Sequence, residues 1–139
     1  MIHIREMKET DKPSLRQLYL DSRRVAFYWS DPESMHLADF DHDTKEEHVF
    51  IAALDQRIIG FISLYPPDNF IHCLFIDPRF KGQGTGHLLL EKAKQSLHLP
   101  MTLKCLSRNT PALAFYEKEG WEKINEVAAQ DPYWNMIYK

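Results

Sequence analysis

Three of the chain's five glycines fall together in Lys81-Gly82-Gln83-Gly84-Thr85-Gly86, a short stretch that links a predicted strand to a predicted helix. The apolar run Phe70 to Ile76 before it reads as the strand. Leu89, Ala93 and Leu97 after it lie at helical spacing and mark the buried face of the helix. The first amides of a helix have no intrahelical acceptor and carry the positive end of the helix dipole. The stretch therefore predicts a site for a phosphate-bearing ligand.

The glycine spacing differs from that of two common phosphate loops. A dinucleotide-binding loop has a further glycine at position i+5, but His87 stands there when counting from Gly82, and Leu89 when counting from Gly84. A nucleoside-triphosphate loop ends in Gly-Lys-Ser or Gly-Lys-Thr, whereas Lys81 precedes the glycines here. The stretch is therefore either a phosphate site of another kind or only a flexible strand-to-helix turn.

A second segment has the features of a short, capped helix. Asn109 or Thr110 provides the N-cap, Pro111 fits the first turn, and Gly120 is placed to end the helix in a left-handed conformation. Tyr116, inside this helix, is either a core aromatic residue or a functional hydroxyl.

Together the two segments resemble the GNAT N-acetyltransferase superfamily. The pyrophosphate loop of that superfamily reads Gln or Arg, two residues, Gly, one residue, then Gly or Ala. Lys81 to Gly86 matches it except that Lys81, a point charge without the planar fork of arginine, stands where Gln or Arg is usual. Asn109 to Trp121 is similar to the C-terminal signature, in which Asn, Ala, an aromatic-Tyr pair and Gly-Phe recur at these spacings. The resemblance is good from Asp55 to Trp121 and looser across the rest.

The order of predicted elements agrees with this resemblance. Strand-like runs lie at residues 2–5, 49–54, 57–65, 70–76, 101–106, 121–127 and 133–138. The tight turn Asp55-Gln56 predicts an antiparallel hairpin, whereas a strand-helix-strand unit around the glycine loop predicts parallel pairing. The implied fold class is α/β, with a GNAT-like central mixed twisted sheet of about six to seven strands flanked by about four helices on both faces. We expect residues 1–139 to form a single acetyltransferase domain.

Composition and charge argue against several classes of partner. The chain of 139 residues has a formal net charge of −3 and a pI of about 6.1, so it lacks the basic character of most nucleic-acid-binding proteins. No apolar run approaches the ~20 residues of a membrane span, and the N-terminus lacks the apolar core of a secretory signal. We therefore expect no nucleic-acid or membrane partner and a cytoplasmic location.

The two cysteines predict no separate chemistry. Cys73 and Cys105 fall in apolar runs, where a free thiol usually behaves as a small hydrophobic side chain. His72 adjoins Cys73, but successive side chains of a strand point to opposite faces, so we expect no pair of nucleophile and base. A structural disulfide is not expected in the cytoplasm.

The resemblance implies acetyl-coenzyme A as co-substrate and no metal. In the family a backbone amide of the strand before the glycine loop polarises the thioester carbonyl, here around Phe75 or Ile76. Asn109 matches a position that holds the pantetheine arm or orders water, and its alternative role is a plain helix cap. The residues implied for coenzyme binding are Leu74, Phe75, Ile76, Lys81, Gly82, Gln83, Gly84, Thr85, Gly86, Asn109 and Tyr116.

The resemblance also implies two catalytic residues, Tyr116 and His72. A tyrosine hydroxyl has an ordinary pKa near 10 and can donate a proton to the coenzyme thiolate, whose conjugate acid titrates at about 8.5. The amine substrate arrives as an ammonium ion and needs a base, and some arylalkylamine-type members carry a histidine at the place of His72. A buried histidine bonded to a backbone group is the alternative there. Asp68, Asp77 and an ordered water are other candidate bases.

The region from Arg23 to Glu47 corresponds to the variable segment in which acceptor specificity usually resides. From Asp31 to Glu47 it carries seven carboxylates against one lysine. Aromatic faces together with carboxylates suit a cation, so we expect a small cationic or aromatic primary amine as substrate. The alternative is a solvated acidic loop whose aromatic residues cap the core. The residues expected near the substrate are Trp29, Asp39, Phe40 and Asp43.

Two other functions fit the same motifs. A protein or peptide N-acetyltransferase would need an open groove for its substrate. A non-catalytic acyl-coenzyme A sensor would keep the glycine loop but would have no need for Tyr116 or a base. A homodimer is also compatible with an exposed strand at Tyr133 to Met136, although exposed apolar residues alone do not establish an interface.

Overall fold

The seven predicted strands form one mixed sheet with the order β1-β2-β3-β4-β5-β7-β6. The structure, a computed structural model, describes residues 1–139. All neighbouring strands pair antiparallel except β4 and β5, which run parallel as predicted. The strands are β1 (Ile2–Glu6), β2 (His48–Leu54), β3 (Arg57–Tyr65), β4 (Phe70–Ile76), β5 (Met101–Leu106), β6 (Glu122–Val127) and β7 (Tyr133–Tyr138).

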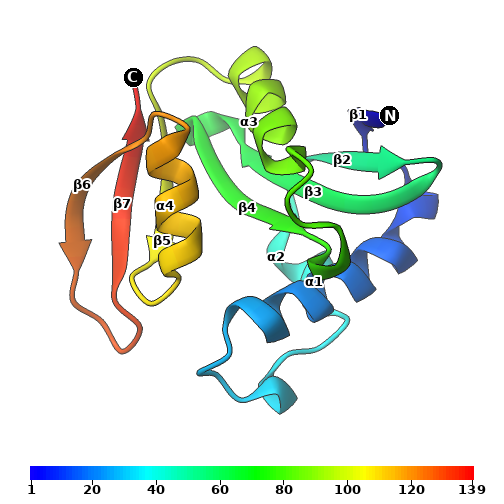
Figure 1. The fold of residues 1–139 in the computed structure, drawn as a ribbon, viewed down its shortest axis with the longest axis horizontal. Helices are drawn as coiled ribbons and strands as arrows, with labels where there is room; N and C mark the ends of the chain where they lie inside the picture. The colour runs from blue at the N-terminus through cyan, green and yellow to red at the C-terminus, as the bar shows by residue number, and fades with distance from the viewer.

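Four α-helices cover the two faces of the sheet, which confirms the predicted arrangement (Figure 1). They are α1 (Lys12–Ala26), α2 (Asp39–Asp43), α3 (Thr85–Ser96) and α4 (Thr110–Lys118). Helices α3 and α4 share one hydrophobic core with the sheet, while α1 and α2 pack into a second core on the opposite face. None of the helices combines the length and apolar character that a bilayer-spanning segment requires.

The tight turns have the backbone conformations that their residues predict. Asp55 and Gln56 both have positive φ, 49° and 71°, and close the hairpin between β2 and β3. Gly120 has a φ of 98° just after α4, as expected for a left-handed helix end.

Strand β4 is irregularly paired along both of its edges. Toward β3 the register shifts so that Ser63 pairs with Cys73 and Leu64 with Ile71, which leaves His72 as the extra residue of a β-bulge. Toward β5 only Phe70 and Ile71 pair, with Thr102 and Leu103. Beyond Ile71 the facing edges of β4 and β5 have no partner strand.

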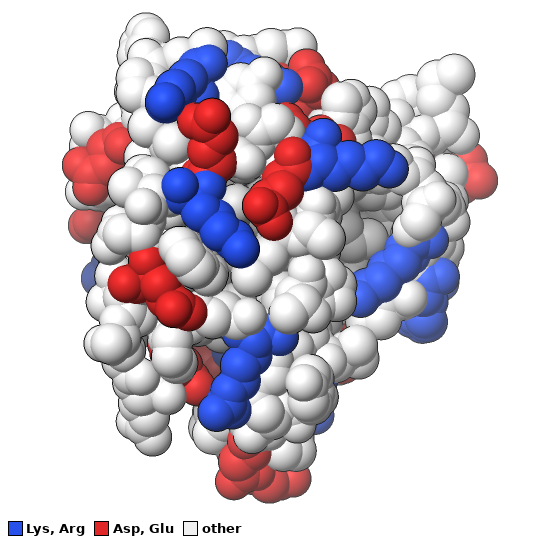
Figure 2. All heavy atoms as spheres, turned by 60° about the vertical axis from the view of Figure 1, so that its left-hand side comes forward, with Lys and Arg blue, Asp and Glu red and all other residues white.

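The strand expected to be exposed for dimerisation lies inside the sheet instead. Strand β7 is paired with β5 on one side and with β6 on the other, and Met136 is fully buried. The expected exposure of Tyr133 to Met136 is therefore wrong, because the edge strand is β6, in which all residues except Val127 are exposed. Around this edge, lysines and arginines are interleaved with aspartates and glutamates, without an extended patch of one sign (Figure 2).

Candidate functional site

The glycine-rich loop presents a series of unpartnered backbone amides. The turn Pro78–Phe80 leads into the loop, and α3 begins at Thr85. The amides from Gln83 through His87 donate to no acceptor in the protein, and the first amide of this region with an acceptor is that of Leu88. These amides lie at the positive end of the α3 dipole, so they suit an anionic group.

The three glycines of the loop have two different structural roles. Gly82 and Gly84 have left-handed φ angles of 80° and 77°, and a Cβ atom at either would find no protein atom within 4 Å. A Cβ atom at Gly86 would lie 2.9 Å from Cζ of Phe115, so this glycine permits close packing of α3 against α4. Gly86 therefore serves helix packing, whereas the space beside Gly82 and Gly84 is open. Lys81 beside them is exposed and takes part in no ion pair.

Asp77 fixes the backbone between β4 and the loop. Its carboxylate accepts hydrogen bonds from the Arg79 amide (3.0 Å) and from Nη2 of Arg79 (2.8 Å), and its own amide donates to the Ile59 carbonyl (2.7 Å). The hydrogen bonds from the Arg79 side chain lower the pKa of Asp77. The carboxylate is therefore an anchor of the loop, which argues against the alternative role of base. Asp68, the other aspartate considered, is exposed in the turn Pro66–Asp68 that precedes β4.

The unpaired edge of β4 carries free peptide groups. Peptide N–H groups alternate in direction along a strand. Because the amide of Asp77 faces β3, that of Phe75 also faces β3, whereas the amides of Leu74 and Ile76 face the side from which β5 has separated. Of the two residues expected to polarise a carbonyl, the geometry favours Ile76 over Phe75.

Tyr116 of α4 is buried in the core that α3 and α4 share with the sheet. Burial raises its pKa, and the thiols of Cys105 on β5 and Cys73 on β4 add to this effect. The ring packs against Phe115 and Trp121, with centroid distances of 5.3 and 6.0 Å. No hydrogen bond to a protein group contributes to the shift of its pKa. The hydroxyl therefore stays protonated at neutral pH, as a proton donor must.

His72 is paired with Glu47, a contact that the sequence did not reveal. Nδ1 of His72 lies 2.8 Å from Oε2 of Glu47, and the histidine side chain is 40% exposed. The expected alternative, a buried histidine bonded to the backbone, is therefore wrong. The β-bulge also breaks the strict alternation of side chains assumed for His72 and Cys73, since both lie near Glu47. Burial, together with Glu47, raises the pKa of the Cys73 thiol to about 12, which supports the expectation that it is not a nucleophile.

Three of the four residues expected around an amine substrate are engaged within the protein. Phe40 is fully buried in the core beneath α2. Asp39 accepts a hydrogen bond from Nη1 of Arg23 at 3.0 Å, and Asp43 accepts one from the Tyr19 hydroxyl at 2.6 Å. The alternative, in which the segment caps the core, describes these residues better.

The fourth residue, Trp29, lies against the loop between β5 and α4. The Arg108 guanidinium lies 5.7 Å from the centre of its ring, so one aromatic face already has a cation. The indole Nε1 is buried without a hydrogen-bond partner. Next along the chain, Asn109 accepts a hydrogen bond from the Ala112 amide at 3.3 Å, which is the helix-cap role.

Comparison with known proteins places these features in a family. The sequence model of the Acetyltransferase (GNAT) family matches residues 12–121. The chain belongs to the GNAT acetyltransferase family.

Individual GNAT proteins show the same relationship. Peptidyl-lysine N-acetyltransferase YiaC of Escherichia coli (strain K12) is 28% identical, with 97% of this chain and 95% of that protein covered. Peptidyl-lysine N-acetyltransferase YjaB of Salmonella typhimurium (strain LT2) is 32% identical over 67% of this chain and 66% of its own length. The structure of PaiA N-acetyltransferase from Thermoplasma acidophilum, in complex with coenzyme A, has a TM-score of 0.83 at 19% identity, and 100% and 99% of the two chains are covered. The fold prediction is confirmed, and the protein is an acyltransferase of the N-acetyltransferase class.

The loop fits the coenzyme that the GNAT fold binds. A diphosphate needs several hydrogen-bond donors and a nearby cation. The free amides from Gln83 to His87, the open space over Gly82 and Gly84, and the unpaired Lys81 meet these needs.

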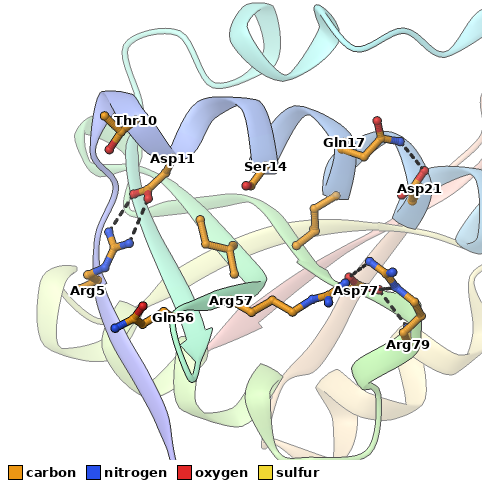
Figure 3. A pocket seen from close by; sticks show the side chains of 12 residues that line it. Arg5, Thr10, Asp11, Ser14, Gln17, Asp21, Gln56, Arg57, Asp77 and Arg79 are labelled. Atoms are coloured by element: carbon orange, nitrogen blue, oxygen red, sulfur yellow. Dashed lines mark hydrogen bonds and ion pairs between the residues drawn. The ribbon is translucent and has the colours of Figure 1, made fainter.

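One hollow of this GNAT protein is lined by ion pairs. It has a volume of about 490 Å³ and lies between α1 and the β2–β3 turn (Figure 3). Arg5 pairs with Asp11 and Arg79 with Asp77, each at 2.8 Å, and Arg57 extends toward Asp77. Most of the charged side chains that line this hollow therefore pair with one another. The expected acid and base lie outside it.

Proposed function

We propose that this GNAT protein transfers an acetyl group from acetyl-coenzyme A to the primary amine of a lysine side chain in a protein or peptide. The observation that carries the proposal is the separation of β4 from β5 beyond Ile71, which leaves the amides of Leu74 and Ile76 without a partner strand. The similarity to YiaC and YjaB, both peptidyl-lysine N-acetyltransferases, supports the choice of acceptor. In this proposal residues 1–139 act as one acetyltransferase domain, and the cytoplasmic location and the homodimer stay predictions.

Coenzyme binding is assigned to two adjacent parts of the chain. The amides from Gln83 to His87 hold the diphosphate, and Lys81 adds a cation that no carboxylate neutralises. The amides of Leu74 and Ile76 face the thioester end. Asn109 contributes through its side-chain nitrogen, because its oxygen caps α4.

Acetyl-coenzyme A supplies a thioester whose carbonyl carbon bonds to the amine nitrogen as the bond from carbon to sulfur breaks. The Ile76 amide donates a hydrogen bond to the carbonyl oxygen, where negative charge develops. His72 accepts, at Nε2, the proton that the substrate ammonium loses before attack. Tyr116 donates its proton to the departing thiolate and is reprotonated by the second proton of the amine nitrogen. One proton is released in each turnover.

A small cationic or aromatic amine is the alternative acceptor, and it is supported by the acid-rich segment from Asp31 to Glu47. Its expected carboxylates, Asp39 and Asp43, already accept hydrogen bonds from protein groups, and Phe40 offers no exposed ring. A lysine on a protein surface does not need a binding site enclosed by aromatic rings and carboxylates. The lysine acceptor is therefore favoured.

Acceptor preference is tested by following thiol release with lysine-containing peptides and with a panel of small amines, each at saturating acetyl-coenzyme A. We expect turnover with peptides, and mass spectrometry should place the acetyl group on the lysine Nζ. Peptides in which lysine is replaced by arginine serve as controls. A consistent preference for small amines would overturn the lysine acceptor, and coenzyme binding without turnover on any amine would favour the sensor.

A further inference from the structure

Glu47 is a nearly buried carboxylate that no step of the proposed reaction uses. Its side chain is only 10% exposed. It accepts a hydrogen bond from Oγ of Ser63, a fully buried residue of β3, and its oxygens Oε2 and Oε1 lie 2.8 and 3.0 Å from Nδ1 of His72. A carboxylate withdrawn from water is costly unless its oxygens are paired. Ser63 and His72 provide that pairing, and no lysine or arginine does.

The β-bulge of β4 explains how two residues distant in sequence come together. His72 is the extra residue opposite the Ser63 and Leu64 pairs, and an extra residue in a bulge turns its side chain away from the regular alternation. This change of direction brings Nδ1 of His72 into contact with the carboxylate of Glu47, the residue just before β2. Nε2 of the same ring has no protein partner, and the side chain is 40% exposed.

We propose that Glu47 is a positioning residue for His72: it accepts the hydrogen of Nδ1–H and so leaves the lone pair of Nε2 for the substrate ammonium. The inference rests on the proposed function, in which His72 is the base. A neutral imidazole carries its proton on one nitrogen only, and the hydrogen bond made by that nitrogen selects the tautomer. Once His72 has taken up the proton, the imidazolium stays in contact with a carboxylate, which stabilises it.

The other charged groups near this pair are already engaged with one another. Asp43 of α2 accepts a hydrogen bond from Tyr19 of α1 at 2.6 Å, and Arg23 of α1 pairs with Asp39 at 3.0 Å. The neighbouring Cys73 thiol has a pKa raised to about 12 and stays neutral. Within this group, His72 is the residue that contacts the carboxylate of Glu47 directly.

A double-mutant cycle tests the coupling with saturating acetyl-coenzyme A and a varied amine substrate. We expect Glu47→Ala to lower kcat/KM for the amine by roughly tenfold or more, as part of the about 10²–10⁴-fold that a general base contributes. The KM for acetyl-coenzyme A should stay unchanged. In a His72→Ala background the same substitution should have no further effect, because the two residues act as one unit. Equal losses in both backgrounds would mean a merely structural role and overturn the proposal.

Neighbouring and conservative variants control for folding. Glu46→Ala changes an adjacent, exposed carboxylate, and its activity should match the wild type. Glu47→Gln keeps the shape and one acceptor oxygen, so it should retain more activity than Glu47→Ala if hydrogen bonding to Nδ1 matters. Equal activities of the two Glu47 variants would contradict the role of the hydrogen bond.

Nitrogen-15 NMR of histidine-labelled protein tests the tautomer without any turnover. We expect His72 to carry its proton on Nδ1 in the wild type and to shift toward the Nε2–H form in Glu47→Ala. An Nε2–H tautomer in the wild type would overturn the proposal. Full turnover by His72→Ala would instead remove His72 as base, and with it the catalytic role of Glu47, while leaving acetyl transfer itself intact.

Discussion

Replacing Tyr116 by phenylalanine separates the chemistry from the fold. The change removes one oxygen atom whose pKa is shifted by burial and by neighbouring thiols and not by any hydrogen bond. The hydroxyl makes no hydrogen bond to a protein group and is not one of the side-chain atoms buried without a partner, so its removal should leave the free energy of unfolding nearly unchanged. The ring contacts with Phe115 and Trp121 are kept. We therefore expect Tyr116→Phe to fold as well as the wild type.

Activity should respond very differently to the same change. Proton donation to a leaving group contributes about 10²–10⁴-fold, which corresponds to roughly 3–5 kcal/mol in the activation barrier. We expect kcat of Tyr116→Phe to fall by that factor in a thiol-release assay. The dissociation constant of coenzyme A, measured by calorimetry, should stay the same, because the proposal assigns diphosphate binding to Lys81 and to the unpartnered amides at the start of α3.

The pH dependence provides a second measurement on the same hydroxyl. Burial raises the pKa of Tyr116 above its ordinary value near 10, so the donor form persists to higher pH than in a free tyrosine. The wild type should show no loss of kcat through Tyr116 between about pH 6 and 9. Tyr133→Phe, a half-buried tyrosine of β7, is the matched control and should keep full activity. A Tyr116→Phe enzyme with near-normal kcat, or one that loses activity only because it unfolds, would refute the assignment.

Three other predictions concern the loop, the core and the thiols. Gly84→Ala places a side chain at a φ of 77°, next to the free amides. The change should lower the free energy of unfolding by roughly 1–2 kcal/mol and weaken coenzyme A binding several-fold in calorimetry. Unchanged affinity would contradict the loop assignment. Phe40→Ala should lower the free energy of unfolding by roughly 3–5 kcal/mol in urea, and a loss below about 1 kcal/mol would contradict its core position. Burial raises the pKa of Cys105 to about 11 and that of Cys73 to about 12, from 9.0. Their contribution to stability is complete below pH 9 and is lost as pH rises from there to about 12, so the free energy of unfolding should fall in that window, less steeply in Cys105→Ala.

Much of the fold could be predicted because it depends on residues close together in the sequence. The bounds of β3, β4, β5 and β7 agree with the apolar runs, since each run is closed by turn residues or by a change of pattern. The positive φ angles of Asp55 and Gln56 follow from the two-residue turn that must join the hairpin. The unpartnered amides of the glycine loop likewise follow from a helix that begins there.

The remaining features depend on contacts between distant parts of the chain. The sequence shows seven carboxylates from Asp31 to Glu47, but it does not show which groups they contact. In the structure Asp39 and Asp43 accept hydrogen bonds from Arg23 and Tyr19, and Glu47 contacts a histidine 25 residues away. Gly86 appeared to belong with the other loop glycines, although its role is to admit Phe115 of α4. A β-bulge has no reliable sequence signal, so the position of His72 could be found only in the structure.

The proposed chemistry depends on the places where β4 fails to pair regularly. A strand paired along both edges uses every peptide N–H in the sheet, and none would remain for a carbonyl oxygen. The early separation from β5 frees the amides of Leu74 and Ile76. The proposed acid, Tyr116, is held in the core by α4. On the other edge, the bulge against β3 turns His72 toward Glu47. In this proposal the two irregularities give one strand both a free amide for the carbonyl oxygen and an oriented base, while the pairing of the neighbouring strands supplies the rigidity that these groups need.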